Sequence, residues 1–246
     1  MEALMEKLSA YGRYLELSDD IPYWESQVPE LKERIRELEW NRLGKERELT
    51  ELQTPNFFQK LFGGVEEKKE KLHQQLSQAT AAWNAAKWEL EDLEKKINAG
   101  KETLEALSHS REDYEAAKQN AALTSAQESQ LMMAELTAFT PAAISAADRC
   151  LEALEDARFW MQEDAVRKGV RDANQKMACL ARAEENAVRL VQILSIMPEG
   201  AASVGRYLRS PEGYVDAVTS EFARLDRLNN AISQVRETRN QLRMLQ

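Results

Sequence analysis

The stretch from Leu72 to Leu107 constrains the fold of this chain more than any other part of the sequence. Apolar or small residues recur there in alternating steps of four and three: Leu72, Leu76, Ala79, Trp83, Ala86, Leu90, Leu93, Ile97, Gly100, Leu104 and Leu107. Such positions form one stripe along an α-helix, and the stripe needs a partner helix. Polar and charged residues fill most of the intervening positions, so the sequence predicts one long amphipathic helix.

Composition extends this prediction to the whole chain. Charged residues make up 30% of the sequence and aromatic residues 7%, with 9 Gly and 6 Pro among 246 residues. Alternation typical of strands is nowhere sustained. We therefore expect an all-α protein, built from long antiparallel helices that form a coiled-coil-like extended helical bundle.

Prolines suggest where the helices of the N-terminal part begin and end. A first helix is expected from about Glu2 to Leu17, with Pro22 and Pro29 bracketing a short linker or a first helical turn, because proline is tolerated mainly at the first turn of a helix. A second helix then runs to about Leu52. Arg42 and Lys45 occupy the centre of its apolar stripe, which predicts either a splayed contact or matching acidic partners.

The rest of the chain is divided by similar signals. The long helix is expected to start near Val65, to fold back antiparallel on the second helix and to continue through Gly100. A bend or short loop is expected around residues 108–126. Pro141 should open a further helix, which reaches Met197 if Gly169 does not break it, and Pro211 should open the last helix.

The charge distribution suggests two regions. Residues 1–140 hold 18 Lys+Arg and 27 Asp+Glu, whereas residues 141–246 hold 15 of each, with Arg replacing most Lys. We interpret 1–140 as an acidic helical hairpin region with an aromatic tip at 54–64, and 141–246 as an Arg-rich hairpin, packed together as one elongated domain. The C-terminal Arg residues are expected to pair with acidic side chains of neighbouring helices, although an acidic partner or phosphates would also suit them.

Several features indicate a reducing, cytoplasmic setting. Cys150 and Cys179 are the only cysteines, and on one continuous helix they would lie about 40 Å apart, too far to bridge. The first residues lack the pattern of a secretory signal, and no apolar run approaches the length of a membrane span. The net charge of −9 argues against nucleic acid as a partner.

Residues suited to catalysis or to metal binding are few. His73 and His109 are the only histidines, and the Glu70-to-His73 pair matches one half of the motif that binds two metal ions in helical bundles. A second copy of that motif is missing, so a solvated helix face is the simpler interpretation. Cys150 and Cys179 lie among Ala and Leu, as buried structural cysteines do. We expect neither enzymatic activity, nor a cofactor, nor a metal site.

The aromatic tip is the candidate binding site. Phe57, Phe58, Leu61 and Phe62 share one face of a short segment between Pro55 and Gly63. Exposed, they would form a docking surface for a protein or a shallow membrane anchor. Covered, they would be a hydrophobic plug folded over another helix pair.

The functional expectation is a structural, scaffold-type coiled-coil protein that acts through protein-protein interaction. Self-association into a homo-oligomer along incompletely filled stripes would fit the pattern. The first alternative is a peripheral membrane-associated helical protein that uses the Phe57 to Phe62 tip. A more remote alternative is a helical-bundle metalloprotein around His73.

Overall fold

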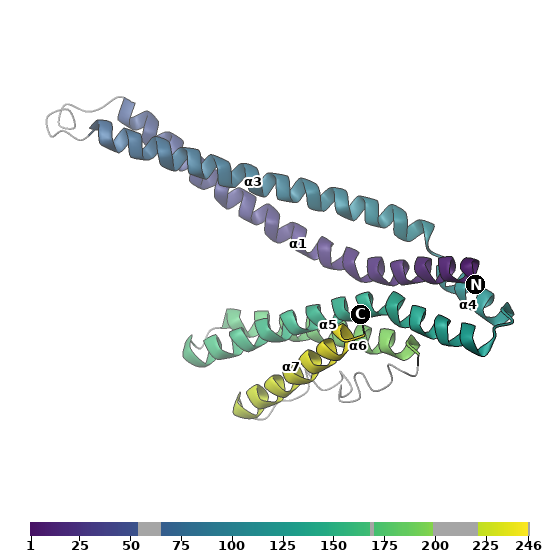
Figure 1. Ribbon diagram of the computed structural model, residues 1–246. Helices are drawn as coiled ribbons and strands as arrows, with labels where there is room; N and C mark the ends of the chain where they lie inside the picture. Colours follow the sequence, from purple (N-terminus) through teal and green to yellow (C-terminus); the bar gives the residue numbers. More distant parts are fainter. Residues whose placement is uncertain (54–64, 168–169, 199–220, 246) are drawn as a thin grey trace. The chain divides into compact units, whose positions relative to one another are not determined.

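The chain is predominantly helical in the part that the structure describes. The computed structural model describes the backbone of residues 1–53, 65–167, 170–198 and 221–245. Its helices are α1 (Glu2–Gln53), α3 (Val65–Ala106), α4 (Ser110–Asn120), α5 (Ser125–Arg167), α6 (Val170–Ile196) and α7 (Glu221–Arg243) (Figure 1). No strand occurs within these ranges. The predicted all-α helical bundle is therefore confirmed, while supercoiling of the helices stays a prediction.

The chain forms two compact units. One, which we call the bundle unit, comprises Met1–Asp20 together with Leu104–Gln246, and the other, the hairpin unit, comprises Ile21–Thr103. The polypeptide passes from one unit to the other within α1 and again within α3. Position 140/141, where the charge balance of the sequence changes, lies inside α5.

The hairpin unit consists of the later part of α1 and most of α3, which run antiparallel as predicted (Figure 1). Residues of the predicted stripes lie between the two helices, where Leu31, Ala79, Ala86 and Ile97 are buried. A small cluster of Leu49, Leu52 and Leu72 closes the far end of the described hairpin. Ion pairs cross between the helices from Lys101 to Glu25 at 2.6 Å, Lys32 to Glu94 at 3.0 Å and Arg34 to Glu89 at 3.3 Å.

Gly100 lies within α3, so the prediction of a continuous helix through this residue is confirmed. A β-carbon at position 100 would lie 3.2 Å from Cγ1 of Ile21 and 3.3 Å from Cζ3 of Trp24. Contacts this short are tighter than ordinary van der Waals packing. Glycine costs about 1 kcal/mol relative to alanine in a helix interior, and here it permits the close approach of α1 and α3.

The helix boundaries predicted at Pro22, Pro29 and Pro141 are wrong, whereas Pro211, predicted to open the last helix, lies outside the described residues. Pro22 and Pro29 lie inside α1, and Pro141 lies inside α5. An interior proline removes one backbone hydrogen bond and costs about 3 kcal/mol, which burial of neighbouring side chains offsets. Leu17, Ile21 and Trp24 are buried near the first proline, and Phe139, Ala142 and Ala143 near the last.

The core of the bundle unit is built around α5. Helices α6 and α7 both pack against it, and the first part of α1 contributes Leu4, Leu8, Tyr11 and Leu15 to the same apolar cluster. Residues on several sides of α5 are buried and mostly small: Ala142, Ala143, Ala146, Ala147, Cys150, Ala153 and Ala157. Small side chains let helices approach α5 closely from more than one direction, as ridges fit into grooves.

Helices α5 and α6 are separate elements, so residues 141–197 do not form one helix. Helix α6 packs against α5 (Figure 1), and the Sγ atom of Cys150 donates to the carbonyl oxygen of Ala183 over 3.4 Å. Cys179 lies only one helical turn from Ala183. The separation of about 40 Å, which is expected if the two cysteines lie on one helix, therefore does not apply. The structure has both as free, buried thiols.

The segment from Leu107 to Thr124 confirms the predicted bend. Residues 107–109 form a turn, α4 follows, and residues 121–124 connect it to α5. Thr124 opens α5, because its Oγ1 accepts from the backbone N–H of Gln127 at 3.4 Å while the Gln127 side chain accepts from the backbone N–H of Thr124 at 2.9 Å. This reciprocal pattern is that of a capping box.

Candidate functional site

The predicted binding residues Phe57, Phe58, Leu61 and Phe62 lie outside the described residues. Their use as a docking surface or a membrane anchor stays a prediction. None of the helices that the structure describes contains a segment long and apolar enough to cross a membrane. The candidate surface that the described residues offer lies on the two helices that precede and follow this segment.

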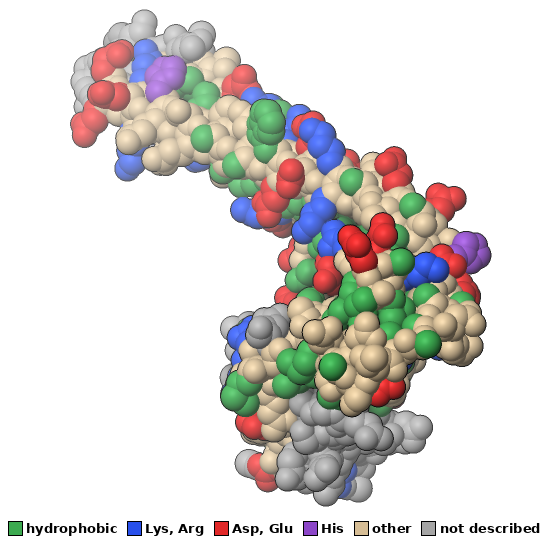
Figure 2. Space-filling model, turned by 45° about the vertical axis from the view of Figure 1, so that its right-hand side comes forward, with side chains coloured by type: hydrophobic (Ala, Val, Ile, Leu, Met, Phe, Trp, Pro, Cys, Tyr) green, Lys and Arg blue, Asp and Glu red, His purple; other side chains and the backbone are tan. Residues whose placement is uncertain are grey.

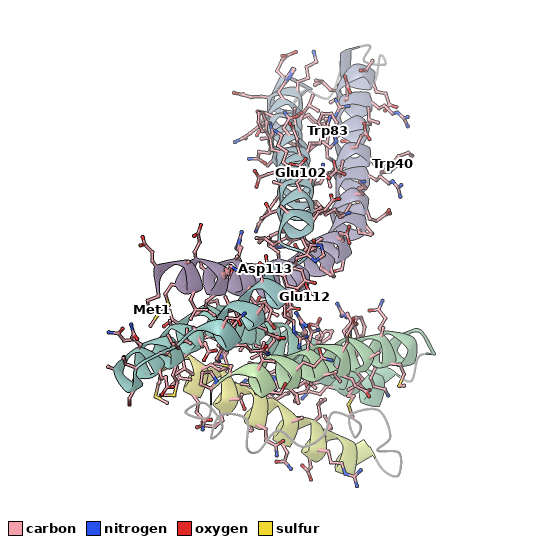
Figure 3. The ribbon with its side chains drawn as sticks, turned by 90° about the vertical axis from the view of Figure 1, so that its right-hand side faces the viewer. Met1, Trp40, Trp83, Glu102, Glu112 and Asp113 are labelled. Carbon is pink, nitrogen blue, oxygen red and sulfur yellow. The ribbon has the colours of Figure 1, made fainter. Side chains whose placement is uncertain are left out.

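Two tryptophans project from the outside of the hairpin unit. Trp40 on α1 is 72% exposed and Trp88 on α3 is 71% exposed. Each lies two residues beyond a stripe position, at Leu38 and Ala86 respectively, and so points away from the partner helix. Figure 3 shows Trp40 on the side of α1 that faces away from α3. The two indole groups therefore lie on opposite sides of the hairpin.

Trp83 takes the opposite orientation and lies between the helices (Figure 3). The Arg42 guanidinium lies 5.0 Å from the centre of its ring, and the Lys87 ammonium lies 4.5 Å from it. Arg42 also pairs with Glu46 at 3.3 Å, and Lys45 pairs with Glu48 at 3.4 Å. The predicted acid-matched contact is confirmed, with the acids supplied by α1 itself.

The surroundings of the exposed tryptophans differ. Near Trp40, the Arg47 guanidinium lies 5.9 Å from the ring centre, and Arg36 and Glu37 are exposed. Near Trp88, the exposed residues of α3 are uncharged from His73 to Ala85, whereas Lys87 and the residues that follow Trp88, such as Glu91 and Asp92, are charged and exposed. Acidic and basic side chains are interspersed over much of the hairpin surface in Figure 2. An uncharged stretch as long as the one before Trp88 is thus unusual on this unit.

Sequence reasoning assigned a function to neither Trp40 nor Trp88. The signal was present in the spacing, because a residue two positions after a stripe position lies on the outer face of the helix. Outer positions are usually polar, so a tryptophan at such a position makes the surface around it a candidate binding site.

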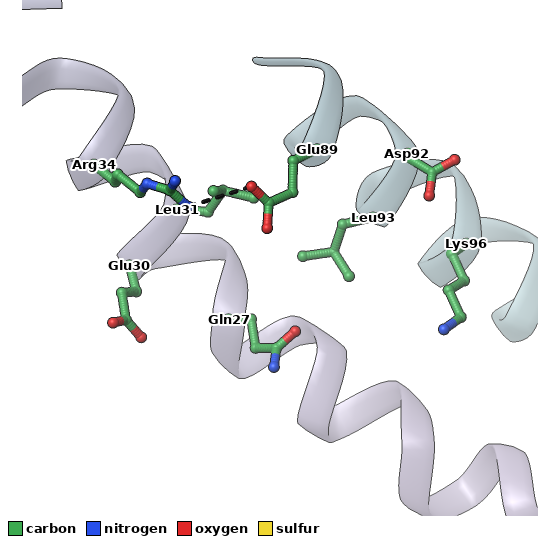
Figure 4. Close-up of a pocket in the computed structure, with 8 residues that line it drawn as sticks. All are labelled: Gln27, Glu30, Leu31, Arg34, Glu89, Asp92, Leu93 and Lys96. Carbon is green, nitrogen blue, oxygen red and sulfur yellow. Dashed lines mark hydrogen bonds and ion pairs between the residues drawn. The ribbon is translucent and has the colours of Figure 1, made fainter. Parts of the chain in front are cut away.

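A shallow groove runs between α1 and α3 in the same unit, with a volume of about 370 Å³ (Figure 4). Leu31 and Leu93 lie at its centre, and the polar residues around them are Gln27, Glu30, Arg34, Glu89, Asp92 and Lys96. Arg34 pairs with Glu89 at 3.3 Å, and the Lys96 ammonium lies 4.1 Å from the ring centre of Trp24. These pairings leave the groove without a cluster of groups that converge on one point.

The most buried charged groups lie in the bundle unit and hold α1 to α5 and α6. Arg149 bonds the Asp20 carboxylate and the Asp19 carbonyl oxygen, and Arg189 bonds the Asp19 carboxylate. Burial raises the pKa of Asp19 above its usual value, although Arg189 opposes that shift. The Arg side chains of the C-terminal part thus pair partly with the N-terminal helix, through Asp19 and Asp20. Their role is structural.

The C-terminal arginines make the predicted ion pairs within the bundle unit. Arg236 of α7 pairs with Glu155 of α5 at 2.7 Å, and Arg239 and Arg243 pair with Asp148 at 3.1 and 3.3 Å. The side chain of Arg224 lies outside the described residues. Arg236, Arg239 and Arg243 therefore each form an ion pair with an acidic residue of α5.

Glu135 is a second buried acid, and it joins α4 to α5. The Tyr114 hydroxyl donates to its Oε1 at 2.5 Å, and Lys118 bonds the same oxygen. Burial raises the pKa of Tyr114, and the hydrogen bond to Glu135 raises it further. Tyr114 also stacks on Tyr11 with ring centres 6.1 Å apart. The arrangement fixes helices in place and offers no open site.

The remaining catalytic and metal-binding candidates from the sequence do not form a site in the described residues. Burial raises the pKa of the Cys150 thiol to about 12, so the thiolate that a nucleophile requires is disfavoured. His73 and Glu70 are exposed on α3. Within the described ranges, no three His, Cys, Asp or Glu side chains are grouped closely enough to hold a metal ion.

No protein-family model matches the chain, and neither a curated protein nor a solved structure is significantly similar to it. Any functional conclusion therefore rests on the chain's own surfaces.

Proposed function

We propose that this chain is a non-enzymatic, scaffold-type protein that binds protein partners through the outward faces of its helical hairpin. The observation that supports this most directly is the exposure of Trp40 and Trp88, at 72% and 71%, on helices whose inner faces are already packed. A tryptophan exposed to water lacks the favourable free energy that burial of its large apolar surface would provide. Tryptophan is also the residue type most enriched at the energetic centres of protein interfaces.

A non-enzymatic role is supported by where the perturbed groups lie. Active sites concentrate shifted pKa values in open clefts. Here Asp19, Tyr114 and Cys150, whose pKa values are raised, lie between packed helices of the bundle unit. In the groove of the hairpin unit, Arg34 is paired with Glu89, and the Lys96 ammonium lies over the ring of Trp24.

We also propose a reducing compartment, the cytoplasm, as the setting. Cys150 and Cys179 are free thiols buried in contacts of α5 and α6. Small proteins of oxidising compartments commonly use their cysteines as disulfides. Two buried thiols are consistent with the proposal.

Photocrosslinking in the cells that make the protein tests the interaction role. A photoreactive amino acid is placed at Asn84, one turn before Trp88, or at Asn41, beside Trp40; all of these residues are exposed. The same probe at Gln130, an exposed residue of α5, is the matched control. We expect light-dependent adducts from the hairpin positions and none from Gln130, with the Asn84 adducts lost in a Trp88→Ser background.

Mass spectrometry of the adducts identifies the partner. Absence of adducts from both hairpin positions, or adducts that persist unchanged when Trp40 and Trp88 are both replaced by serine, would overturn the proposed function. Replacement of these exposed residues should leave the helical circular dichroism spectrum unchanged, which separates lost binding from lost folding.

A further inference from the structure

The outer face of α3 carries an uncharged stretch that the packing of the hairpin does not explain. From Leu72 to Ala86 no residue is Asp, Glu, Lys or Arg, although 30% of the chain is charged. The residues of this stretch that face outward are exposed: His73, Gln74, Ser77, Gln78, Ala81, Ala82, Asn84 and Ala85. The solvent-facing side of an amphipathic helix is normally charged.

One row of side chains runs along the middle of this face. Glu67, Gln74, Ala81, Trp88 and Lys95 follow one another at intervals of seven residues, so they lie in line along α3. All of them are exposed. We call this row the outer row of α3; it spans about 42 Å at 1.5 Å per residue. It places small Ala81 at the centre, Trp88 to one side and opposite charges at the ends.

The residues of the outer row match those of a second copy of the row that runs in the opposite direction. When two copies of α3 lie antiparallel with a two-fold axis at Ala81, each Trp88 faces Gln74 of the other copy. Each Lys95 then faces Glu67 of the other copy, and Lys71 comes close to Asp92 in the neighbouring row. A parallel arrangement would instead place like charges against each other.

We propose that the outer row of α3 is a self-association surface, on which a second copy of this chain packs antiparallel about Ala81. This inference rests on the proposed function and names the partner of the Trp88 face. A two-fold contact uses the same patch on both copies, as this row would. The small residues around Ala81 allow the helices to approach closely, and Trp88 is the anchor on either side of the axis.

Lys95 can bond Glu67 of the second copy because its ion pair with Glu91 leaves its side chain largely exposed. It pairs with Glu91 at 2.8 Å and its side chain remains 70% exposed. An ammonium has three donor hydrogens, so Lys95 can bond Glu91 and Glu67 of the second copy together. Its charge also offsets the approach of Glu91 to Glu70 of the second copy, which is the unfavourable pair in this register.

Trp40 provides a matched control on the opposite side of the hairpin. It has nearly the same exposure and the same outward position as Trp88, but Arg36 and Glu37 stand one turn before it, where Asn84 and Ala85 stand before Trp88. Trp40 therefore lacks the uncharged stretch on which a second helix could pack, whereas the charged residues that follow Trp88 find partners of opposite sign in the proposed register. Self-association should therefore depend on Trp88 and not on Trp40.

The test is light scattering coupled to size exclusion, with sedimentation equilibrium, on the purified full chain. Wild type should have twice the chain mass of 28.1 kDa. Trp88→Ser should raise the dimer dissociation constant at least tenfold, and Ala81→Glu, which places two carboxylates together at the axis, should give a monomer. Trp40→Ser should remain a dimer. Circular dichroism of each variant shows whether the helices are intact.

A charge exchange tests the antiparallel register. Glu67→Lys and Lys95→Glu should each weaken the dimer at low salt. The double variant should restore it, because each new lysine then faces a new glutamate of the other copy. A monomeric wild type at about 100 µM, a dimer unaffected by Trp88→Ser, or a double variant without recovery would overturn the proposal. A monomeric wild type would overturn self-association but not the proposed function, because photocrosslinking tests binding to a different protein in a separate experiment.

Discussion

Gly12 on α1 lies directly against the backbone of Ala138 on α5: a β-carbon at position 12 would stand 2.7 Å from the carbonyl oxygen of Ala138. Real β-carbons do not approach a backbone oxygen so closely, and the obstacle is main chain and not a flexible side chain. The residue is buried in the bundle unit. This contact sets how closely the first part of α1 can pack on α5.

Gly12→Ala should destabilise the bundle unit by about 1–3 kcal/mol, because the added methyl group forces the two helices apart. Gly44→Ala is the control, since a β-carbon there meets nothing within 4 Å and alanine is the better helix former by about 1 kcal/mol. Urea denaturation followed by circular dichroism measures both. A Gly12→Ala chain as stable as wild type would show that α1 and α5 can separate at little cost.

Tyr114→Phe should lower the free energy of unfolding by about 1–3 kcal/mol, because it leaves the buried Glu135 carboxylate with Lys118 as its remaining partner. The control is Tyr14→Phe, whose hydroxyl makes no hydrogen bond to any described residue. In thermal denaturation, the melting temperature of Tyr114→Phe should be several degrees lower than that of Tyr14→Phe. Equal melting temperatures would mean that the hydrogen bond to Glu135 contributes nothing net.

Asp19→Asn keeps the size of the side chain and removes its titration. Burial raises the pKa of Asp19, so the folded chain holds the proton more tightly than the unfolded chain. The free energy of unfolding of wild type relative to the variant should be greatest below about pH 3.8, the usual value, and should fall as pH rises through the raised pKa. Urea titrations of both proteins across acidic pH give this difference; a rise with pH would contradict the direction of the shift.

Cys150 should resist alkylation in the folded protein. Its pKa is raised to about 12 by burial, so the reactive thiolate is scarce at neutral pH, and the surrounding helices block access. Iodoacetamide labelling, resolved by peptide mass spectrometry, should be at least about a hundredfold slower in buffer than in urea. A native rate close to that of a small thiol would mean that α5 and α6 open readily.

The fold class and the hairpin were predictable because their signals are local and periodic. The stripe from Leu72 to Leu107 needed a partner on physical grounds, and its continuity through Gly100 followed from register alone. The contact that favours glycine there, against Ile21 and Trp24, could not be read from the sequence because it depends on how the helices pair.

The helix ends were predicted less well, since proline was given more weight than the packing around it. Pro22, Pro29 and Pro141 each lie within a helix, because long-range burial outweighs the loss of one hydrogen bond. Near Pro22 the Asp19 carbonyl oxygen accepts from Arg149, 2.5 Å away, which stabilises a carbonyl close to the interruption. No local pattern in the sequence identifies Arg149 as that donor.

The candidate surface was missed for a related reason. Aromatic residues drew attention where they cluster, at Phe57 to Phe62, whereas Trp88 stands alone at the end of a run of small and amide residues. Its significance comes from its three-dimensional position, as an exposed indole next to an uncharged stretch of the outer helix face. The stripe register and the gap in charged residues would together have indicated it.

The discontinuous make-up of the bundle unit has a consequence for synthesis of the chain. Residues 1–20 leave the ribosome well before the residues after position 104 that bury Leu4, Leu8 and Leu15. The hairpin unit pairs neighbouring segments and can form while translation continues. The N-terminal segment must wait with its apolar side uncovered until α5 has emerged, and this interval is when the nascent chain is most exposed to chaperones and to aggregation.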